Sequence, residues 1–480
     1  MPRRIRSRPL RVWRDPEYVF RTRFADAVYA VWLDGGADAA SGVSVIAAAH
    51  AGSEFVTADG GRRTVTRSRP VDADPGEVVV EASVFEVLGE ALREAAVDRT
   101  GPLGWFGWFG YELGARLNEV PVSTADTPDA AFLFLDRAIV FDHAARTVRL
   151  LWLEEDDSAH DEAERWADEL VAVLEAEPAA SATPIVAGTL GASVAPAPSE
   201  NPAVRWRHAP ERYAELIAEC QAAIVRGDAY QLCLTNRVDV DTRPDPAATY
   251  LALRASSPTH HGGYVRFGDI ALLSASPEQF LHVDPDGVVS TKPMKGTRPR
   301  GADARLDAEL RRELLESEKE RAENLMIVDL MRNDLGRIAE LGSVTVPSLL
   351  DVEEYAHVHQ LVSTVRARIR APFTALDVVQ AAFPAGSMTG APKHSAMTIL
   401  HELEDGPRGI YSGAFGYLGV DGSADLAMVI RSIVLTPGGA SIGTGGGITA
   451  LSVAEEEIEE TRVKARALLA VLGAASVPEE

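Results

Sequence analysis

Segments typical of strands and segments typical of helices follow one another along this chain without a steady alternation. Apolar residues at helical spacing predict helices over Pro210–Val225 and Ala375–Ala382. Apolar runs of strand length predict strands over Tyr230–Val240 and Leu361–Ile369. A doubly wound parallel sheet would need a regular strand–helix rhythm, so the pattern predicts an α+β fold built on large antiparallel sheets.

The same criteria place further elements along the chain. Two more helices are expected, over Asp303–Leu330 and Ala454–Leu472. The other expected strands lie within Val28–Leu33, Phe132–Phe141, Val148–Leu153, Tyr264–Leu273, Phe280–Val283, Gly413–Gly419 and Ala427–Leu435.

The composition changes between roughly Glu175 and Asn201, where Ala, Pro, Ser and Gly dominate and periodicity is lost. We therefore expect an N-terminal region over 1–175, a linker or exposed loop over 176–204 and a second region over 205–476. In the N-terminal region the glycine-aromatic run Gly104–Leu113 predicts core packing, because its large apolar side chains favour burial. A nucleic-acid stacking surface is the alternative for this run, and the acidic balance of the chain disfavours it.

The charge of the chain limits its partners. It has 47 basic and 71 acidic residues and a net charge of −24, which repels phosphate backbones and anionic lipid. We expect no nucleic-acid and no membrane partner, and we interpret the arginine-rich segment Met1–Arg14 as a surface arm that lacks the apolar run of a signal peptide. Cys220 and Cys233 are too few for a disulfide framework, which predicts two buried thiols in a cytoplasmic protein.

One lysine stands out by its position. Lys295 lies in Thr291–Gly301, where Pro293, Gly296 and Pro299 predict an irregular loop instead of regular strand pairing. Loops of this kind often carry function, and a solvated basic turn is the alternative.

Two predicted helices carry glutamates three residues apart on one face, namely Glu320 with Glu323 and Glu457 with Glu460. If these faces meet, four carboxylates would repel one another unless a hard divalent cation lay between them. The pattern therefore predicts a Mg²⁺ site, although either pair alone is more often a solvated face. Before the second helix, the glycine run Gly443–Ile448 offers free amide hydrogens that can hold a carboxylate, with a plain hairpin as the alternative.

Five segments carry a resemblance to known proteins, and they are Gly227–Arg237, Ser274–Glu278, Glu323–Gly336, Phe383–Lys393 and Tyr411–Tyr417. Together they resemble the chorismate-utilising enzymes, which include anthranilate synthase, aminodeoxychorismate synthase, isochorismate synthase and salicylate synthase. The resemblance extends from about Trp206 to Leu472 and is weaker in the N-terminal region. It implies two large stacked antiparallel β-sheets flanked by helices.

The resemblance also implies roles for single residues. Glu323 and Glu460 would coordinate Mg²⁺, with Glu320 and Glu457 around them, and the ion would bind the ring carboxylate of chorismate. The residues implied to bind the rest of the substrate are Tyr411, Arg431, Lys464, Thr389, Gln231 and the amides of Gly445 and Gly447. Chorismate is a dianion, so both of its carboxylates would meet positive groups or donors.

Two positions distinguish between the reactions of the enzymes that this chain resembles. Gln231 stands where the water-adding members have a lysine base, and an amide cannot deprotonate water. Lys295 stands in Pro293-Met-Lys-Gly-Thr297, which is similar to the Pro-Ile-Lys-Gly-Thr of aminodeoxychorismate synthases and not to the Pro-Ile-Ala-Gly-Thr of anthranilate synthases. We therefore expect amination of chorismate at C4, with the anthranilate reaction as the alternative.

In the implied mechanism Lys295 attacks C2 of the ring while the C4 hydroxyl leaves, protonated by Glu278, and ammonia then attacks C4 and expels the lysine. The attacking amine must be neutral, so its pKa must fall from about 10.4. A milder alternative is that Lys295 acts only through its charge. Because neither cysteine has the setting of a glutaminase nucleophile, we expect ammonia from a separate glutamine amidotransferase subunit.

One position departs from the anthranilate pattern, which has a histidine directly before Leu361. This chain has Gln360 there and His359 one residue earlier, on the opposite face of an expected strand. We expect neither residue to be catalytic.

Overall fold

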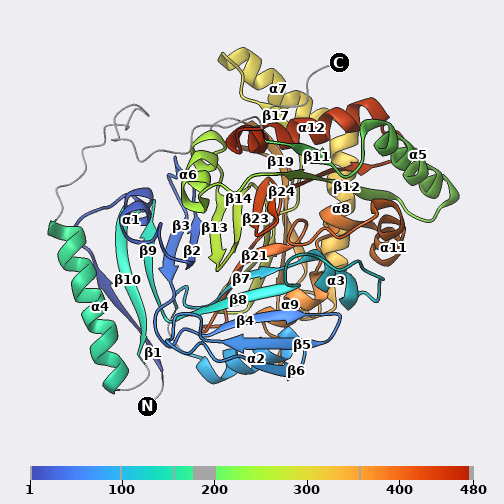
Figure 1. Ribbon diagram of the computed structural model, residues 1–480. Helices are drawn as coiled ribbons and strands as arrows, with labels where there is room; N and C mark the ends of the chain where they lie inside the picture. Colours follow the sequence, from blue (N-terminus) through green and yellow to red (C-terminus); the bar gives the residue numbers. More distant parts are fainter. Residues whose placement is uncertain (1–2, 98–99, 155–156, 177–201, 356–357, 475–480) are drawn as a thin grey trace.

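Two antiparallel sheets of twelve strands each form the body of the molecule, within the residues that the computed structural model describes, 3–97, 100–154, 157–176, 202–355 and 358–474 (Figure 1). The predicted α+β class with large antiparallel sheets is confirmed. Most of the linker expected over 176–204 lies outside the described residues, because 177–201 are not among them.

The first sheet contains strands from both halves of the chain. In spatial order its strands are β1 (Arg4–Pro9), β10 (Thr147–Glu154), β9 (Arg137–Asp142), β3 (Val43–Ala48), β2 (Tyr29–Asp34), β13 (His261–Phe267), β14 (Ile270–Ser276), β23 (Ser432–Thr436), β24 (Gly439–Ile448), β12 (Gln231–Val240) and β11 (Val204–Trp206), with β20 (Gly390–Ala391) also paired to β12.

The second sheet is mixed in the same way. Its order is β17 (Met294–Pro299), β19 (Val358–Arg368), β16 (Val288–Thr291), β15 (Gln279–Val283), β22 (Ala424–Met428), β21 (Ala414–Gly419), β7 (Gly104–Phe109), β8 (Ala130–Leu135), β4 (Phe55–Asp59), β5 (Thr64–Ser68) and β6 (Val78–Glu81), with β18 (Thr345–Glu354) also paired to β19.

Helices cover the outer faces of both sheets. Their bounds are α1 (Pro16–Arg23), α2 (Val84–Ala95), α3 (Tyr111–Leu117), α4 (Asp157–Ala176), α5 (Pro210–Arg226), α6 (Pro246–Ser256), α7 (Ala304–Glu316), α8 (Glu318–Gly336), α9 (Ala375–Ala382), α10 (Gly386–Thr389), α11 (Lys393–Glu404) and α12 (Ala454–Val471). Figure 1 shows α7 projecting from the body near α12.

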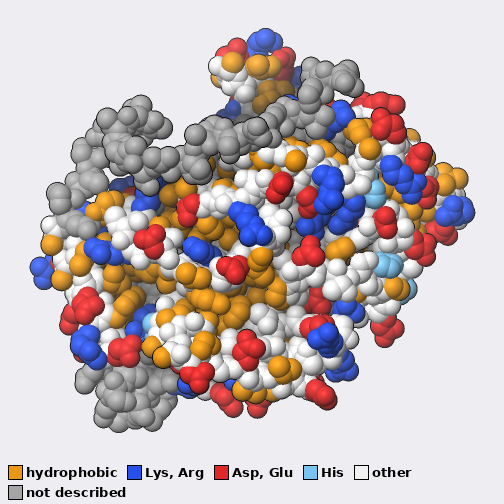
Figure 2. Space-filling view, viewed as in Figure 1, with side chains coloured by type: hydrophobic (Ala, Val, Ile, Leu, Met, Phe, Trp, Pro, Cys, Tyr) orange, Lys and Arg blue, Asp and Glu red, His pale blue; other side chains and the backbone are white. Residues whose placement is uncertain are grey.

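The three largest apolar cores of the described residues hold these layers together. One core lies between the sheets, where Val265 and Leu272 of the first sheet pack with Phe106 and Trp108 of the second. A second core joins the first sheet to α1, α4, α6 and α12, and a third joins the second sheet to α2, α8 and α9. On the face drawn in Figure 2, apolar side chains gather across the middle, and basic and acidic side chains are interspersed around them.

The glycine-aromatic run is part of the core, as predicted. Every residue of β7 is buried, between β21 and β8. A side chain at Gly107 could not fit, because its Cβ would lie 1.9 Å from the carbonyl oxygen of Ala131. No surface for stacking on nucleic-acid bases is present at this run.

Most expected elements are present, but four were predicted as single pieces and are not. The expected strand Phe132–Phe141 is divided into β8 and β9, and the expected strand Tyr264–Leu273 into β13 and β14. The expected helix Asp303–Leu330 is broken at Ser317, which ends α7 and caps α8 through a hydrogen bond from the Glu320 amide to its hydroxyl. The expected strand Ala427–Leu435 is divided into β22 and β23, with Arg431 between them at a φ of 51°.

The segment around Lys295 is a strand and not the predicted irregular loop. β17 pairs with β19 in antiparallel register, with Lys295 opposite Leu361. The register shifts between Lys295 and Thr297, where Gly296 takes a φ of 79° that favours glycine. The glycine therefore makes a bulge in a strand.

The N-terminal arginines do not form a surface arm. Residues Arg4–Pro9 make the edge strand β1, paired to β10. The buried Arg14 side chain donates a hydrogen bond to the carbonyl of Leu174 in α4. The segment is thus integrated into the first sheet.

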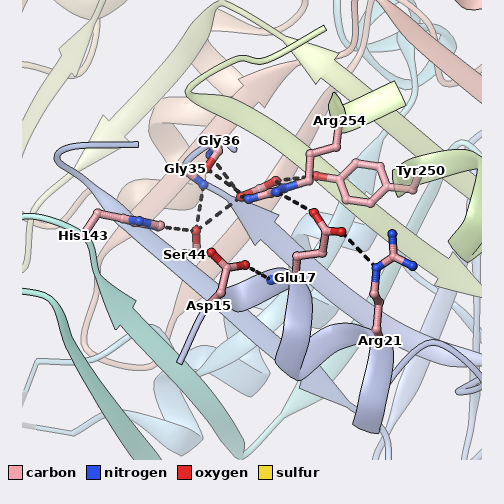
Figure 3. Close-up of polar contacts among 10 residues, drawn as sticks. Asp15, Glu17, Arg21, Gly35, Gly36, Ser44, His143, Tyr250 and Arg254 are labelled. Atoms are coloured by element: carbon pink, nitrogen blue, oxygen red, sulfur yellow. Dashed lines mark hydrogen bonds and ion pairs between the residues drawn. The ribbon is translucent and has the colours of Figure 1, made fainter. Parts of the chain in front are cut away.

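A buried ion-pair network fastens the N-terminal helix to the first sheet (Figure 3). Arg254 of α6 donates to Asp34 Oδ2 at 2.6 Å and to Glu17 Oε2 of α1 at 3.0 Å. Tyr250 donates to Asp34 as well, at 3.0 Å. The Arg254 guanidinium also lies over the ring of Trp32, 4.9 Å from its centroid.

Candidate active site

A cavity of about 520 Å³ lies where β17, α8, α12 and the end of β24 meet. It brings together most of the residues singled out in the sequence. Of the predicted site residues, those that line it are Glu278, Lys295, Glu320, Glu323, Arg431, Gly445, Gly447, Glu457, Glu460 and Lys464.

Lys295 reaches the cavity from the bulge in β17. Its Nζ lies 3.4 Å from Oε2 of Glu323 on α8. Burial lowers the pKa of this lysine, but Glu323, Cys233 and Glu278 raise it more, so the net pKa is above its usual value. The amine is therefore a protonated, partly buried cation beside a carboxylate.

Glu278 stands between β14 and β15 with its side chain buried. Ser387 donates a hydrogen bond to Oε1 of Glu278 at 3.1 Å. Burial raises the pKa of Glu278 to about 7, against the smaller lowering effects of Lys295 and Ser387. This carboxyl group can hold or release a proton near neutral pH, which is the property of a general acid.

The four glutamates of the two helices face the same cavity. Burial and the nearby Glu323 raise the pKa of Glu320. Burial also raises the pKa of Glu457, and the charges of Glu460 and Glu323 add to that effect. The mutual repulsion anticipated from the sequence is thus present in the fold.

Each of these carboxylates has a cationic partner in this structure. Glu323 pairs with Lys295, and the partners of the other three are Arg298 for Glu320 at 3.8 Å, Lys319 for Glu457 at 3.6 Å and Lys464 for Glu460 at 2.5 Å. Within the described residues no three Asp, Glu, His or Cys side chains are arranged to hold a metal ion. The donor set, four carboxylates from two helices at one cavity, still has the oxygen chemistry that Mg²⁺ prefers.

Two further cationic side chains, Arg431 and Lys464, line the cavity. Lys464 of α12 donates to the carbonyl of Gly445 at 2.6 Å. Burial lowers the pKa of Arg431, against the raising effect of Tyr411 and Glu460. Tyr411 is not among the residues that line this cavity. It packs over Gly443, where an added Cβ would lie 2.0 Å from its ring, and it lines a separate, smaller cavity.

Gln231 and Thr389 are not among the residues that line the 520 Å³ cavity. The Gln231 side chain is buried beside Gly447, where an added Cβ would lie 1.9 Å from its Nε2 and 3.4 Å from Lys295 Nζ. Its Oε1 has no hydrogen-bond partner among the described residues. The fully buried Thr389 hydroxyl donates to the carbonyls of Ala385 and Gly386 within its own turn.

The strand β19 presents His359 and Gln360 to opposite sides, as the alternation predicts. His359 is fully buried against α7, with Nε2 2.9 Å from Asp307 Oδ1. Gln360 lines the cavity. The histidine is therefore directed away from Lys295.

Several residues of the cavity were missed by the sequence reasoning. Ser387 contacts Glu278, Lys319 pairs with Glu457, and the backbone of Cys233 forms part of the wall. Lys319 could have been found, because it directly precedes Glu320 on the same helix. Ser387 and Cys233 lie in segments that carry the resemblance, yet nothing in their own pattern marks them.

Comparison with known proteins identifies the family. The family model described as chorismate binding enzyme matches residues 46–470 of the chain. The chain belongs to this family of chorismate-binding enzymes. The resemblance drawn from the five sequence segments is confirmed.

Two relatives are similar to the chain over most of its length. The chain is 43% identical to an aminodeoxychorismate synthase of Streptomyces griseus over 99% of its own length and 65% of that protein. It is 38% identical to anthranilate synthase component 1 of Streptomyces coelicolor, over 76% of this chain and 72% of that one. The chain therefore spans less than two thirds of the length of the aminodeoxychorismate synthase that it matches.

A solved structure has the same fold. The anthranilate synthase component I of Streptococcus pneumoniae superposes with a TM-score of 0.73 and 27% identity, covering 95% of this chain and 99% of that chain. The two stacked antiparallel sheets flanked by helices, implied by the resemblance, are thus confirmed.

Proposed function

We propose that this chain is an aminodeoxychorismate synthase component I, which converts chorismate and ammonia into 4-amino-4-deoxychorismate and water. The observation that carries the proposal is Lys295, which stands in the Pro293–Thr297 motif and projects into a cavity shared with Glu278 and Glu323. The greater identity to an aminodeoxychorismate synthase, over nearly the whole chain, supports the same activity.

The charges of the cavity suit a dianionic substrate. Arg431 and Lys464 supply cations to the cavity, and Gly445 and Gly447 of β24 line it with them. These groups would bind the enolpyruvyl carboxylate of chorismate, with Tyr411 as a further donor. The ring carboxylate would then point toward the glutamates of α8 and α12.

That second carboxylate requires a cation, because the glutamates alone would repel it. Glu323 and Glu460 would hold a Mg²⁺ ion, with Glu320 and Glu457 nearby. The ion would supply positive charge for the ring carboxylate and for the departing hydroxyl. Binding this ion is the only role that we assign to these four side chains, one pair on each helix.

Lys295 would act as the nucleophile. Its Nζ bonds to C2 of the ring while both ring double bonds shift and the C4–O bond breaks. Ammonia then bonds to C4, both double bonds shift back, and the C2–N bond breaks with its electron pair returning to Nζ. The free base is needed for the first step, whereas the ion pair with Glu323 keeps the amine protonated. The proton must therefore pass from Nζ to water when substrate binds, and Nζ regains a proton from water when product leaves.

Glu278 would protonate the leaving hydroxyl. Its pKa of about 7 leaves a large fraction of the carboxyl groups protonated at neutral pH. After water has left, the Glu278 carboxylate can accept the proton that ammonia loses on becoming an amine. The cycle then balances, with one water released for each ammonia consumed.

Ammonia would come from a separate glutamine amidotransferase. Both cysteines of the chain are buried, and burial raises the pKa of the Cys220 thiol to about 12. The pKa of Cys233 is raised as well, by burial. Neither is a glutaminase nucleophile, and the word component in the names of two similar proteins supports a second subunit.

The compartment we propose is the cytoplasm, because two free thiols suit a reducing environment. No helix in the described ranges is both long and apolar enough to cross a bilayer.

The ring position of the new amine tests the proposal. Purified chain is incubated with chorismate, Mg²⁺ and ammonium, excess aminodeoxychorismate lyase is added, and the aromatic products are separated. Para-aminobenzoate that forms only with the lyase supports C4 amination. Ortho-aminobenzoate would establish the rival activity, anthranilate synthesis, and absence of any product would contradict both.

A further inference from the structure

Arg408, in the loop between α11 and β21, lies behind the wall of the active-site cavity. It is only 6% exposed. A guanidinium group has five N–H donors, and here all five are used. The acceptors are Glu404 Oε2 for Nε, the Met388 carbonyl and Ser412 Oγ for Nη1, and the Cys233 carbonyl and Glu404 Oε1 for Nη2.

Two of these acceptors belong to residues that line the cavity itself. Nη1 donates to the Met388 carbonyl at 2.7 Å, and Nη2 donates to the Cys233 carbonyl at 2.9 Å. Met388 lies on α10 and Cys233 on β12, and both residues line the cavity that contains Lys295. One side chain therefore fixes two separate pieces of its wall.

A third contact reaches the neighbour of a proposed substrate-binding residue. Ser412, 3.4 Å from Nη1, directly follows Tyr411 and has a φ of 63°. A non-glycine residue in this left-handed region costs free energy unless surrounding contacts hold it. The Arg408–Ser412 contact helps to hold the turn that aims Tyr411 over Gly443.

The guanidinium is itself held in place by two side chains, Glu404 and Tyr111. Glu404 accepts two hydrogen bonds from it, at 2.8 and 2.7 Å, and also accepts one from the Thr235 amide of β12. The ring of Tyr111 covers one face of the guanidinium, 4.1 Å from the ring centroid. These contacts fix the orientation of the guanidinium group.

The N-terminal region holds the backbone at the same point. The two carboxylate oxygens of Glu112 accept the amides of Arg408, at 2.7 Å, and Gly409, at 3.0 Å. The Tyr111 amide donates to the Gly409 carbonyl at 2.9 Å. Residues nearly 300 positions earlier in the chain therefore clamp the loop that carries Arg408.

We propose that Arg408 is a positioning residue for chorismate binding, fixing the Cys233 and Met388 walls and the Tyr411 turn, with Glu112 as its support. Arg408 does not line the cavity, and so it acts through these three elements. The inference depends on the proposed function only in taking chorismate as the ligand.

Arg254 provides a matched control. Like Arg408, it is buried, being 7% exposed, and it lies over an aromatic ring. Its own hydrogen bonds go to two carboxylates and one carbonyl. Its network joins α1 and α6 to the first sheet (Figure 3). Arg254 does not line the cavity that contains Lys295. Loss of its guanidinium should reduce stability without altering the cavity.

The test compares Arg408→Lys with Arg254→Lys. A lysine keeps the charge but donates from a single nitrogen, so it cannot serve four acceptor groups on separate elements. The dissociation constant for chorismate is measured by calorimetry with Mg²⁺ present, and thermal unfolding is recorded for both variants. We expect both melting temperatures to fall, and the constant to rise at least about tenfold only in Arg408→Lys.

Other outcomes overturn the inference. A folded Arg408→Lys that binds chorismate as the unchanged protein does, or an equal rise in both variants, would reduce Arg408 to a general stabilising residue. Added guanidinium should restore binding to Arg408→Ala, and failure to do so in the folded variant also counts against the inference.

If neither substitution at 408 yields folded protein, Glu112→Gln tests the same clamp while keeping the Arg408 side chain. We expect its dissociation constant for chorismate to rise several-fold, and an unchanged constant would overturn the inference. Failure of the proposed function is distinguishable, because it would appear as chorismate binding without a C4-aminated product in the unchanged protein.

Discussion

Lys295 Nζ and Glu323 Oε2 lie 3.4 Å apart, joining the bulged edge of the second sheet to helix α8. The two side chains are only 16% and 11% exposed, so this contact differs from a surface ion pair, and removal of either side chain leaves the other charge without this partner. The relationship links the two reactive ends of the site, the amine that would attack the ring and the carboxylate that would bind Mg²⁺.

The pH dependence of turnover should report Glu278. Its pKa of about 7 means that the protonated acid predominates below that pH and is lost above it. We expect kcat to fall as the pH rises through about 7, with Lys295 as the charged neighbour that opposes the raised pKa. Glu278→Gln should lower kcat by about 10²–10⁴-fold and abolish this limb. An unchanged pH–rate profile in Glu278→Gln would assign the limb to another group.

Metal binding should depend on Glu323 and Glu460. Glu323→Gln and Glu460→Gln should each weaken Mg²⁺ binding in the presence of chorismate by at least about tenfold, because each removes a charged oxygen ligand. Calorimetric titration with Mg²⁺ measures the effect without reference to activity. Glu459, exposed on the same helix and paired with Arg466, supplies the control Glu459→Gln. Equal binding in all three variants would contradict the assignment.

The glycine at position 447 should be required for the shape of the cavity. An added Cβ would lie 1.9 Å from Nε2 of Gln231 and 3.4 Å from Lys295 Nζ. We expect Gly447→Ala to lower kcat/KM for chorismate at least about tenfold, because Gln231 must move and the new methyl group contacts the lysine. Gly438→Ala, in the turn before the same strand, meets only Thr436 Oγ1 at 3.5 Å and should be neutral. Full activity in Gly447→Ala would show that the cavity tolerates this displacement.

Stability should fall with rising pH because of Glu112. Burial raises its pKa to about 7, and Asp129 adds to the rise, while hydrogen bonds from backbone amides and the charge of Arg408 oppose it. The unfolded chain loses this proton near pH 4.5, so the folded state binds more protons between about pH 4.5 and 7. The free energy of unfolding contributed by this group therefore decreases across that window. Denaturant unfolding of Glu112→Gln should show a shallower decrease, and an identical slope would contradict the prediction.

The antiparallel architecture could be predicted because it rests on local patterns. The spacing of apolar residues gave α9 over Ala375–Ala382 with both ends right, and strand-length runs gave β12 and β19 to within a few residues. The strand formed by the Lys295 segment could not be predicted from local patterns. Its pairing with β19 is set by a partner about 60 residues away, and Pro299 is tolerated because it ends the strand.

The glutamate pairs could be assigned to a single site only through their spacing on two helices and the family resemblance. What the sequence could not supply was the support behind the site. Glu112 and Arg408 are 296 residues apart, and neither lies in a periodic sequence pattern that predicts their contact. Buried polar networks of this kind depend on tertiary packing, which no local pattern encodes.

The most direct test of the account is the product formed by Lys295→Ala, compared with the unchanged protein and with Lys292→Ala. Lys292 lies three residues earlier, pairs with Glu353 and does not line the cavity, so it controls for loss of a nearby positive charge. With chorismate, Mg²⁺, ammonium and aminodeoxychorismate lyase, we predict para-aminobenzoate from the unchanged protein and Lys292→Ala, and none from a folded Lys295→Ala. Equal para-aminobenzoate formation by Lys295→Ala, or ortho-aminobenzoate from the unchanged protein, would contradict the account.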